Sequence, residues 1–247
     1  MEYVLTTENL SKKYKHGYAL NGLSMHVPKG AVYGLVGRNG SGKTTVIRLL
    51  SGLQTPTSGE YTLFGRTGTE REIGKSRRRM GVMFETPSVY LHMTAAENLK
   101  QQYRVLGLPS FDGIPELLKM VGLSGTGKKK VKHFSMGMRQ RLSIAVALCG
   151  DPDFLVLDEP LNGLDPQGIV QIRELILKLN REKQVTVFIS GHILEELSKI
   201  ANHYGFVEEG CMVKEISAKE LEASCKKCIT AEVSDVKVLA RILDGKG

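Results

Sequence analysis

The sequence predicts an α/β fold with a helical insertion. In its 247 residues, short runs of β-branched apolar residues alternate with segments of helical periodicity, as expected for strands layered against helices. Hydrophobic residues make up 41% of the chain and charged residues 24%, and this balance excludes a wholly disordered chain. A glycine-rich loop separates the first of these strands from the helix that follows it.

Strands are expected where apolar, often β-branched runs end at glycine, proline or polar residues. The segments are Ala31–Val36, Tyr61–Phe64, Gly81–Phe84, Phe154–Leu157, Thr186–Ser190 and Gly205–Val207. Helices are expected where apolar residues recur at helical spacing. One such set, after Gly42, is Val46, Ile47, Leu50 and Leu53, and another is Ile172, Leu175, Ile176 and Leu179.

A long helical stretch lies between the strands near residues 84 and 154. It opens with Thr94-Ala-Ala-Glu97, which has the spacing of a capping box: the threonine hydroxyl and the glutamate carboxylate accept hydrogen bonds from exposed backbone N–H groups. Gly107-Leu-Pro109 and Gly122–Gly127 interrupt the stretch. We therefore predict a helical insertion at about residues 87–150.

The glycine-rich loop matches the phosphate-binding pattern G-x-x-x-x-G-K-[ST] in full. The candidate ATP contacts are Gly37, Arg38, Asn39, Gly40, Ser41, Gly42, Lys43, Thr44 and the adjacent Thr45. Glycines let backbone N–H groups turn toward phosphate oxygens, Lys43 is expected to reach the β- and γ-phosphates, and the Thr44 hydroxyl is expected to bind Mg²⁺. A glycine turn with an incidental lysine is the alternative. The strand before the loop and the helix after it favour a nucleoside triphosphate site.

An acidic pair follows a second apolar strand. Phe154–Leu157 ends in Asp158-Glu159-Pro160, and ligands of α/β sheets bind outside the carboxyl ends of the strands. Asp158 is therefore expected to hold Mg²⁺, directly or through water, and Glu159 to polarise an attacking water molecule as the catalytic base. The alternative is a strand end with two solvated acids, which the complete phosphate loop disfavours.

The positive charge is concentrated in one part of the chain. The net charge is +8, and residues 75–141 hold thirteen Lys or Arg against four Asp or Glu, so that this segment carries +9 and the remainder −1. Two interpretations stay open: a solvated face, or a surface for an anionic neighbour. That neighbour could be nucleic acid or the cytoplasmic leaflet of a membrane.

The sequence favours a cytoplasmic location. No apolar stretch approaches the ~20 residues that a membrane-spanning helix needs, and the start of the chain does not resemble a secretory signal. Four cysteines without a disulfide-type spacing fit a reducing compartment. We interpret the pair Cys225 and Cys228 as ordinary thiols.

A segment upstream of the acidic pair indicates a family. Phe134-Ser-Met-Gly-Met-Arg-Gln-Arg141 resembles the signature of the ATP-binding cassette (ABC) ATPases, written LSGGQ and followed by a basic-Gln-Arg run. Ser135 and Gly137 are retained, whereas phenylalanine replaces the leucine and two methionines replace Gly and Gln. The resemblance implies that Ser135 and Gly137 bind the γ-phosphate of ATP at the N-terminus of a helix.

The resemblance covers about residues 1–215 and implies further roles. Tyr14 resembles the aromatic residue that stacks on adenine, Leu161–Asp165 the loop that crosses a dimer interface, and His192 the switch histidine that contacts the γ-phosphate. The implied fold is a RecA-like P-loop core with an antiparallel β subdomain and the helical insertion. Two copies are expected to pair head to tail, with each ATP between Gly37–Thr44 of one chain and the signature of the other.

Glu85 stands where ABC ATPases usually carry glutamine. Together with Pro87 and the Thr94 helix start, it resembles the bacitracin and lantibiotic exporter branch, and it is expected to contact Mg²⁺. Residues 216–247 are expected to form a C-terminal extension, with a strand over 229–233 and a helix over 236–243. Members of this branch commonly have longer chains, so a truncated sequence is expected.

Three function classes compete. The first is the ATPase subunit of an exporter, bound at the cytoplasmic face of the membrane to a separate polytopic subunit, which would confer resistance or immunity to peptide antibiotics. The second is a non-transport ABC ATPase that acts on ribosomes or nucleic acid. Such proteins usually carry two cassettes on one chain or long coiled coils. This sequence shows neither feature, so no nucleic acid is expected as a partner. The third is a soluble P-loop kinase, which would leave Phe134–Arg141 unexplained.

Overall fold

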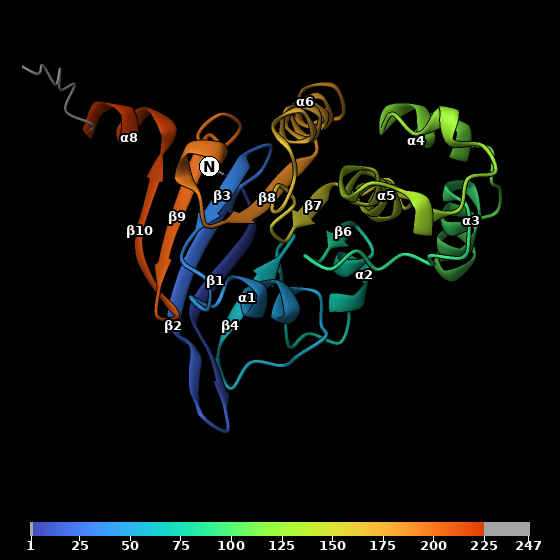
Figure 1. The fold of residues 1–247 in the computed structure, drawn as a ribbon. Helices are drawn as coiled ribbons and strands as arrows, with labels where there is room; N and C mark the ends of the chain where they lie inside the picture. The colour runs from blue at the N-terminus through green and yellow to red at the C-terminus, as the bar shows by residue number, and fades with distance from the viewer. Residues whose placement is uncertain (1, 225–247) are drawn as a thin grey trace, which may run out of the picture.

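The computed structural model describes residues 2–224, which form two β-sheets with helices around them (Figure 1). The strands are β1 (Tyr3–Tyr14), β2 (Gly17–Pro28), β3 (Val32–Val36), β4 (Ser58–Leu63), β5 (Arg66–Thr67), β6 (Met80–Met83), β7 (Phe154–Leu157), β8 (Thr186–Gly191), β9 (His203–Glu208) and β10 (Cys211–Ser217). The α-helices are α1 (Lys43–Leu50), α2 (Ile73–Arg77), α3 (Ala95–Leu106), α4 (Ile114–Met120), α5 (Met136–Leu148), α6 (Pro166–Lys183), α7 (Leu194–Leu197) and α8 (Ala218–Ser224). Two 3₁₀ turns, η1 (Ser124–Thr126) and η2 (Val131–His133), precede α5.

The larger sheet has the strand order β10-β9-β3-β8-β7-β6. All its strands are parallel except β10, which pairs antiparallel with β9. Every residue of β3, β7 and β8 is buried, which is why apolar residues predominate in these strands. Because β3, β7 and β8 are parallel, their carboxyl ends meet at one edge of the sheet. This edge holds the functional site described below.

The smaller sheet is antiparallel, with the order β2-β1-β4-β5. Helix α1 belongs to the core between the two sheets, where Val46, Ile47, Leu49 and Leu50 are fully buried. The expected α/β core with an antiparallel β subdomain is thus confirmed. Packing on both sides fixes α1, and with it the phosphate loop from which α1 starts.

Helices α3, α4 and α5 lie between β6 and β7 in the chain and group together beyond the β6 edge of the sheet (Figure 1, green). The capping box is confirmed: Glu97 N–H donates to Thr94 Oγ1 at 3.1 Å, and Thr94 N–H donates to Glu97 Oε2 at 2.6 Å. Helix α5 packs closely on β6. A Cβ on Gly81 would lie 2.2 Å from the carbonyl oxygen of Ala147, so that only glycine fits there.

Several sequence expectations differ from the structure or concern residues that it does not describe. Leu53 is not on the buried face of α1, because the helix ends at Leu50 and Leu53 is 66% exposed. The long strands β1 and β2 and the strand β10 were absent from the expected elements. The predicted boundary after residue 215 falls inside β10, and the division into 1–215 and 216–247 stays a prediction. The expected elements over 229–233 and 236–243, and the pair Cys225 and Cys228, lie outside the described residues.

Within residues 2–224, none of the helices combines the length and the apolar character that crossing a membrane requires.

Candidate active site

The phosphate loop connects β3 to α1 in a backbone conformation that depends on glycine. Gly40 and Gly42 have φ values of +83° and +106°, a region that side chains disfavour. A Cβ on Gly42 would also lie 2.6 Å from the carbonyl oxygen of Ala19, and one on Gly37 would lie 2.4 Å from Ser41 Oγ. The loop is therefore folded tightly enough for its backbone N–H groups to approach an anion.

Lys43 is folded over this loop. Its Nζ donates to the carbonyl oxygens of Gly37 at 2.7 Å and Arg38 at 3.0 Å, and it lies 3.2 Å from Glu159 Oε1. The side chain is only 5% exposed. A buried ammonium group at a helix N-terminus is suited to bind phosphate oxygens.

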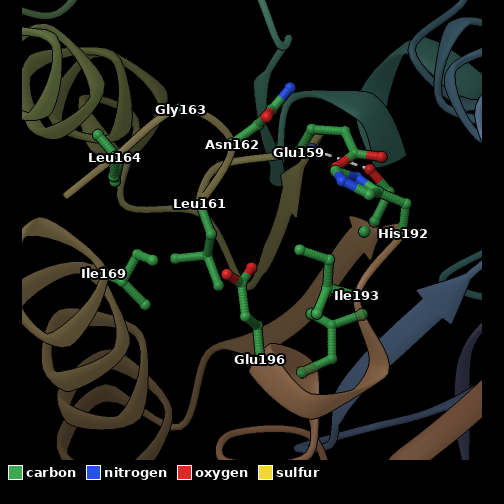
Figure 2. Close-up of a pocket in the computed structure, with 12 residues that line it drawn as sticks. Glu159, Leu161, Asn162, Gly163, Leu164, Ile169, His192, Ile193 and Glu196 are labelled. Atoms are coloured by element: carbon green, nitrogen blue, oxygen red, sulfur yellow. Dashed lines mark hydrogen bonds and ion pairs between the residues drawn. The ribbon is translucent and has the colours of Figure 1, made fainter. Parts of the chain in front are cut away.

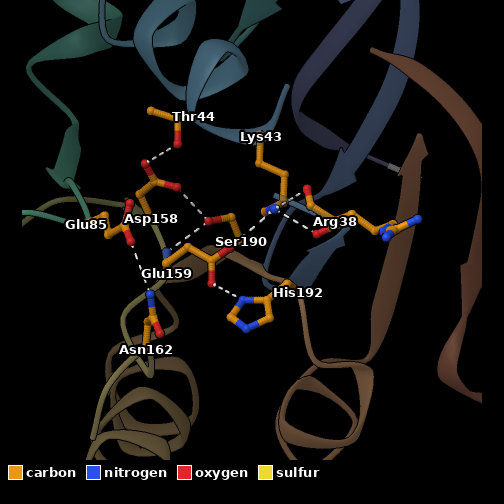
Figure 3. A network of polar contacts seen from close by, with 10 residues as sticks. Arg38, Lys43, Thr44, Glu85, Asp158, Glu159, Asn162, Ser190 and His192 are labelled. Atoms are coloured by element: carbon orange, nitrogen blue, oxygen red, sulfur yellow. Dashed lines mark hydrogen bonds and ion pairs between the residues drawn. The ribbon is translucent and has the colours of Figure 1, made fainter. Parts of the chain in front are cut away.

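Asp158 lies at the end of β7 and is fully buried. Its two oxygens accept hydrogen bonds from Ser190 Oγ at 2.7 Å and Thr44 Oγ1 at 2.8 Å (Figure 3). Burial raises the pKa of Asp158, and the carboxylates of Glu159 and Glu85 add to this rise, whereas the two hydrogen bonds oppose it. A divalent cation would relieve the cost of this buried charge.

Glu159 lies between two cationic or proton-donating groups. Its Oε1 contacts Lys43, and its Oε2 lies 2.9 Å from His192 Nδ1 (Figure 3). The backbone φ of Glu159 is +49°, a left-handed conformation that is unusual for glutamate. Such strain persists where the surrounding structure enforces it, and it is common at functional sites. The carboxylate is thereby held at the carboxyl edge of the sheet.

Glu85 reaches the same site from the segment after β6. It lines one pocket together with Lys43, Thr44, Thr45 and Glu159, and its Oε1 accepts a hydrogen bond from Asn162 Nδ2 at 3.1 Å. The three predicted metal residues, Thr44, Asp158 and Glu85, thus come from the ends of neighbouring elements. The structure brings these three side chains close together, and their role in metal binding stays a prediction.

These residues fit Mg²⁺. A hydroxyl and one or two carboxylates are hard oxygen donors, and Mg²⁺ completes its shell with water and substrate phosphate rather than with a protein cage. No cluster of three or more His, Cys, Asp or Glu side chains suitable for a metal occurs within residues 2–224. Ser41, in the phosphate loop, has a buried Oγ that makes no hydrogen bond within residues 2–224. Its hydroxyl is therefore available to donate to a nucleotide oxygen.

A small pocket lies beside the acidic pair, between the loop after β7 and the segment after β8 (Figure 2). Glu159, Leu161 and Asn162 line it from the loop after β7, and His192 and Glu196 line it from the segment after β8. The loop ends at Asp165, whose Oδ1 accepts a hydrogen bond from Gly168 N–H at 3.1 Å and caps α6. The loop expected at a dimer interface therefore lies directly beside the carboxylate of Glu159.

The structure does not bring three predicted residues to this site. Tyr14, at the end of β1, is 39% exposed, donates a hydrogen bond to Gln54, and does not line the two pockets beside the phosphate loop. Ser135 caps α5 by accepting a hydrogen bond from Met138 N–H at 3.3 Å, and it lines a separate pocket with Gly137. The roles of these three residues in ATP binding stay predictions.

The sequence did not predict the contacts of two residues with the acidic groups, Ser190 and, in the loop expected at a dimer interface, Asn162. Ser190 contacts both acidic residues, and Asn162 contacts Glu85. The sequence gives one indication for Ser190: it is a polar residue at the end of the expected strand Thr186–Ser190. Its contact with Asp158 depends on the pairing of β7 with β8, which no local pattern encodes.

A buried lysine in a glycine-rich loop, with an acidic pair at the end of a parallel strand of the same sheet, defines a P-loop nucleoside triphosphatase. The comparisons narrow this class. The family model described as "ABC transporter" matches residues 20–162. The bacitracin transport ATP-binding protein BcrA of Enterococcus faecalis is 43% identical over 99% of this chain and 79% of its own length.

A second relative and two solved structures indicate the same family. The lantibiotic transport ATP-binding protein SrtF of Streptococcus pyogenes is 41% identical over 90% of this chain and 93% of its own length. Among solved structures, cbiO1 of Clostridium perfringens, part of the ABC transporter complex cbiONQ, has a TM-score of 0.79 at 26% identity and covers 91% of this chain and 92% of its own. The dimeric ATP-binding cassette MJ0796 with ADP and phosphate has a TM-score of 0.78 at 26% identity, covering 87% of this chain and 98% of its own. The chain belongs to the ABC transporter family and is an ATPase of that family.

Proposed function

We propose that this chain powers a peptide-antibiotic exporter and that Glu159, held between Lys43 and His192, is its catalytic base. The position of Glu159 is the observation that carries the catalytic part of the proposal. The relatives named for bacitracin and lantibiotic transport support the substrate class. They also favour transport over a role on ribosomes or nucleic acid.

The residues divide the work of hydrolysis. Backbone N–H groups of the phosphate loop and Lys43 bind the β- and γ-phosphates, so Lys43 exchanges its contact with Glu159 for the nucleotide. Glu159 then accepts a proton from water as the water oxygen bonds to the γ-phosphorus and the bond to the ADP oxygen breaks. His192 orients the carboxylate. Mg²⁺, which Thr44, Asp158 and Glu85 would hold, supplies positive charge against the phosphate oxygens.

The test of the base is Glu159→Gln, which keeps the size of the side chain and removes its basicity. ATP binding should be retained, and turnover should fall by about 10²–10⁴-fold, the usual contribution of a general base. Near-normal turnover of purified Glu159→Gln protein would remove Glu159 from this role. Binding of a fluorescent ATP analogue provides the control for an intact phosphate loop.

The ATP site is proposed to be shared between two copies. Ser135 and Gly137 lie at the N-terminus of α5, which attracts anions, yet they line a pocket distinct from the one that contains Lys43. A second copy in head-to-tail arrangement would place this helix end against the γ-phosphate. The dimeric state of the similar cassette MJ0796 supports this arrangement.

A separate membrane-spanning subunit is the second proposed partner. Copurification of the chain with a coexpressed polytopic protein would support it.

The basic segment 75–141 is proposed to lie near the cytoplasmic leaflet. Lys128, Lys129 and Lys132 are exposed, whereas Arg79 and Lys130 already pair with acidic residues of this chain. Equal sedimentation with neutral and anionic vesicles at low salt would contradict the lipid contact.

A further inference from the structure

Ser190 is a buried hydroxyl that contacts both acidic residues of the site. It lies in β8 and is 1% exposed. Its Oγ donates to Asp158 Oδ1 at 2.7 Å and accepts from the backbone N–H of Glu159 at 2.9 Å (Figure 3). Strand β8 pairs directly with β7, and this pairing places the hydroxyl beneath the turn that carries the acids.

The two hydrogen bonds have fixed directions. A serine hydroxyl has one proton, and because a carboxylate accepts and a backbone N–H donates, that proton points to Asp158 and a lone pair points to Glu159. Asp158 is thus held at both oxygens, by Ser190 on one side and Thr44 on the other. This bidentate arrangement leaves the carboxylate little freedom to rotate.

The second bond acts on the backbone of Glu159. The φ of Glu159 is +49°, and a left-handed conformation of a residue other than glycine persists only when its surroundings enforce it. The bond from Glu159 N–H to Ser190 satisfies a buried backbone donor in that conformation. The conformation in turn places the Glu159 side chain between Lys43 and His192.

We propose that Ser190 is a positioning residue for ATP hydrolysis, whose single hydroxyl orients Asp158 toward the metal and Glu159 toward the attacking water. The inference rests on the roles proposed above for Asp158 and Glu159. A purely structural Ser190, which only satisfies buried polar groups, would affect stability without a selective effect on metal binding or turnover.

Threonine and valine at position 190 form a matched pair of variants. They have nearly the same shape, but only threonine keeps a hydroxyl. Both add the same methyl group to a buried site, so the difference between them reports the hydroxyl alone. Ser190→Ala removes the oxygen and adds no bulk, and it serves if the larger side chains prevent folding.

The experiment has three readouts on the full chain: kcat and KM for ATP, affinity for a fluorescent ADP analogue with and without Mg²⁺, and thermal unfolding without nucleotide. In Ser190→Val and Ser190→Ala we expect kcat to fall about tenfold to hundredfold at unchanged KM, the scale of one hydrogen bond to a charged group. The gain in ADP affinity on adding Mg²⁺ should shrink by about tenfold for the same reason. Affinity without Mg²⁺ should stay unchanged, and Ser190→Thr should behave like the native chain.

Equal kcat and equal Mg²⁺-dependent ADP affinity in Ser190→Thr and Ser190→Val would overturn the inference. The inference would also be overturned if Ser190→Ala lowered only the unfolding temperature and left kcat and the Mg²⁺-dependent ADP affinity unchanged. Glu159→Gln, measured in parallel, separates the role of Ser190 from the proposed role of Glu159 as the base. Retained turnover in Glu159→Gln would refute the proposed base, whereas an inactive Glu159→Gln beside indistinguishable Thr and Val variants would refute only the role of Ser190.

Discussion

At the scale of single residues, the ion pair joins Lys43, the proposed phosphate ligand, to Glu159, the proposed base. The two side chains are 5% and 9% exposed and lie 3.2 Å apart. A buried ion pair persists when further hydrogen bonds satisfy its members, and here Gly37, Arg38 and His192 provide them. Because ATP offers Lys43 a competing anion, binding should release Glu159 for its reaction with water.

Removing one member of this pair should cost more than removing both. Lys43→Ala leaves the Glu159 carboxylate buried without its cation, so we expect the free energy of unfolding without nucleotide to fall by about 3–5 kcal/mol. Adding Glu159→Gln should recover part of this loss, because the orphaned charge is gone. Urea unfolding of the two single variants and the double variant measures the coupling. Additive losses would show that the pair does not contribute as a pair.

Glu85 is the second residue with a testable charge effect. Its carboxylate lies in the pocket of Lys43 and Thr44, where attraction to Mg²⁺ opposes repulsion of the γ-phosphate. We expect Mg²⁺ attraction to win at short range. Glu85→Gln should keep ATP affinity and the Asn162 contact, but it should alter the Mg²⁺ dependence of the ATPase rate. Transport should suffer more than basal hydrolysis.

Two measurements on Glu85→Gln check this prediction: the ATPase rate against Mg²⁺ concentration, and antibiotic resistance of cells that also carry the proposed membrane-spanning subunit. If both match the native chain, Glu85 only marks the lineage and has no separate mechanistic role. Asn162→Ala is the companion variant. It removes the hydrogen bond to Glu85 while keeping the charge, and it should therefore change the Mg²⁺ dependence less than Glu85→Gln does.

At the scale of elements, the sequence predicts best what is encoded locally. Buried parallel strands such as β7 appear as apolar runs, and the capping box of α3 appears as a four-residue spacing. Strands β1 and β2 mix polar and apolar residues, and their pairing contains several register shifts that interrupt alternation. The phosphate loop and the acidic pair were predictable from their motifs. The Ser190 contacts were not, because they depend on sheet register.

The capping box of α3 should stabilise the chain in a pH-dependent way. Hydrogen bonds from Thr94 and Lys130 lower the pKa of Glu97 to about 2. A carboxyl whose pKa is lowered on folding stabilises the native state above its unfolded pKa, and this stabilisation is lost as the pH falls toward the folded value. The urea midpoint of Glu97→Gln should therefore lie below that of the native chain at pH 7, and the gap should narrow below about pH 4.5.

The hydroxyl of the same box can be tested separately. Thr94→Ala should cost about 1 kcal/mol of stability at pH 7, the usual value of an N-cap. Thr94→Ser keeps the hydroxyl and is the matched control. A gap between Glu97→Gln and the native chain that does not change between pH 7 and pH 4 would contradict the proposed ionic contribution.

At the scale of the whole molecule, the proposed catalytic groups and the signature segment lie in different places. Lys43, Asp158 and Glu159 meet at the carboxyl edge of the larger sheet, whereas Ser135 begins α5 in the helical group beyond β6 (Figure 1). Ser135 lines its own pocket together with the segment from Gly163 to Gly168. Since one chain does not bring the signature to its own phosphate loop, the proposed site requires a second copy.

A shared site predicts that two inactive variants restore activity when they are mixed. Lys43→Ala disables the phosphate loop, and Ser135→Asp keeps a capping side chain on α5 but places a negative charge against the γ-phosphate. In a head-to-tail heterodimer, one ATP site combines both defects and the other combines the two intact halves. Random pairing of equal amounts should therefore give about a quarter of the native ATPase rate, since half of the dimers keep one of two sites. Ser135→Thr should be active alone, which controls for the substitution itself. A mixture no more active than its two separate components would place the complete site within one chain and refute the head-to-tail arrangement.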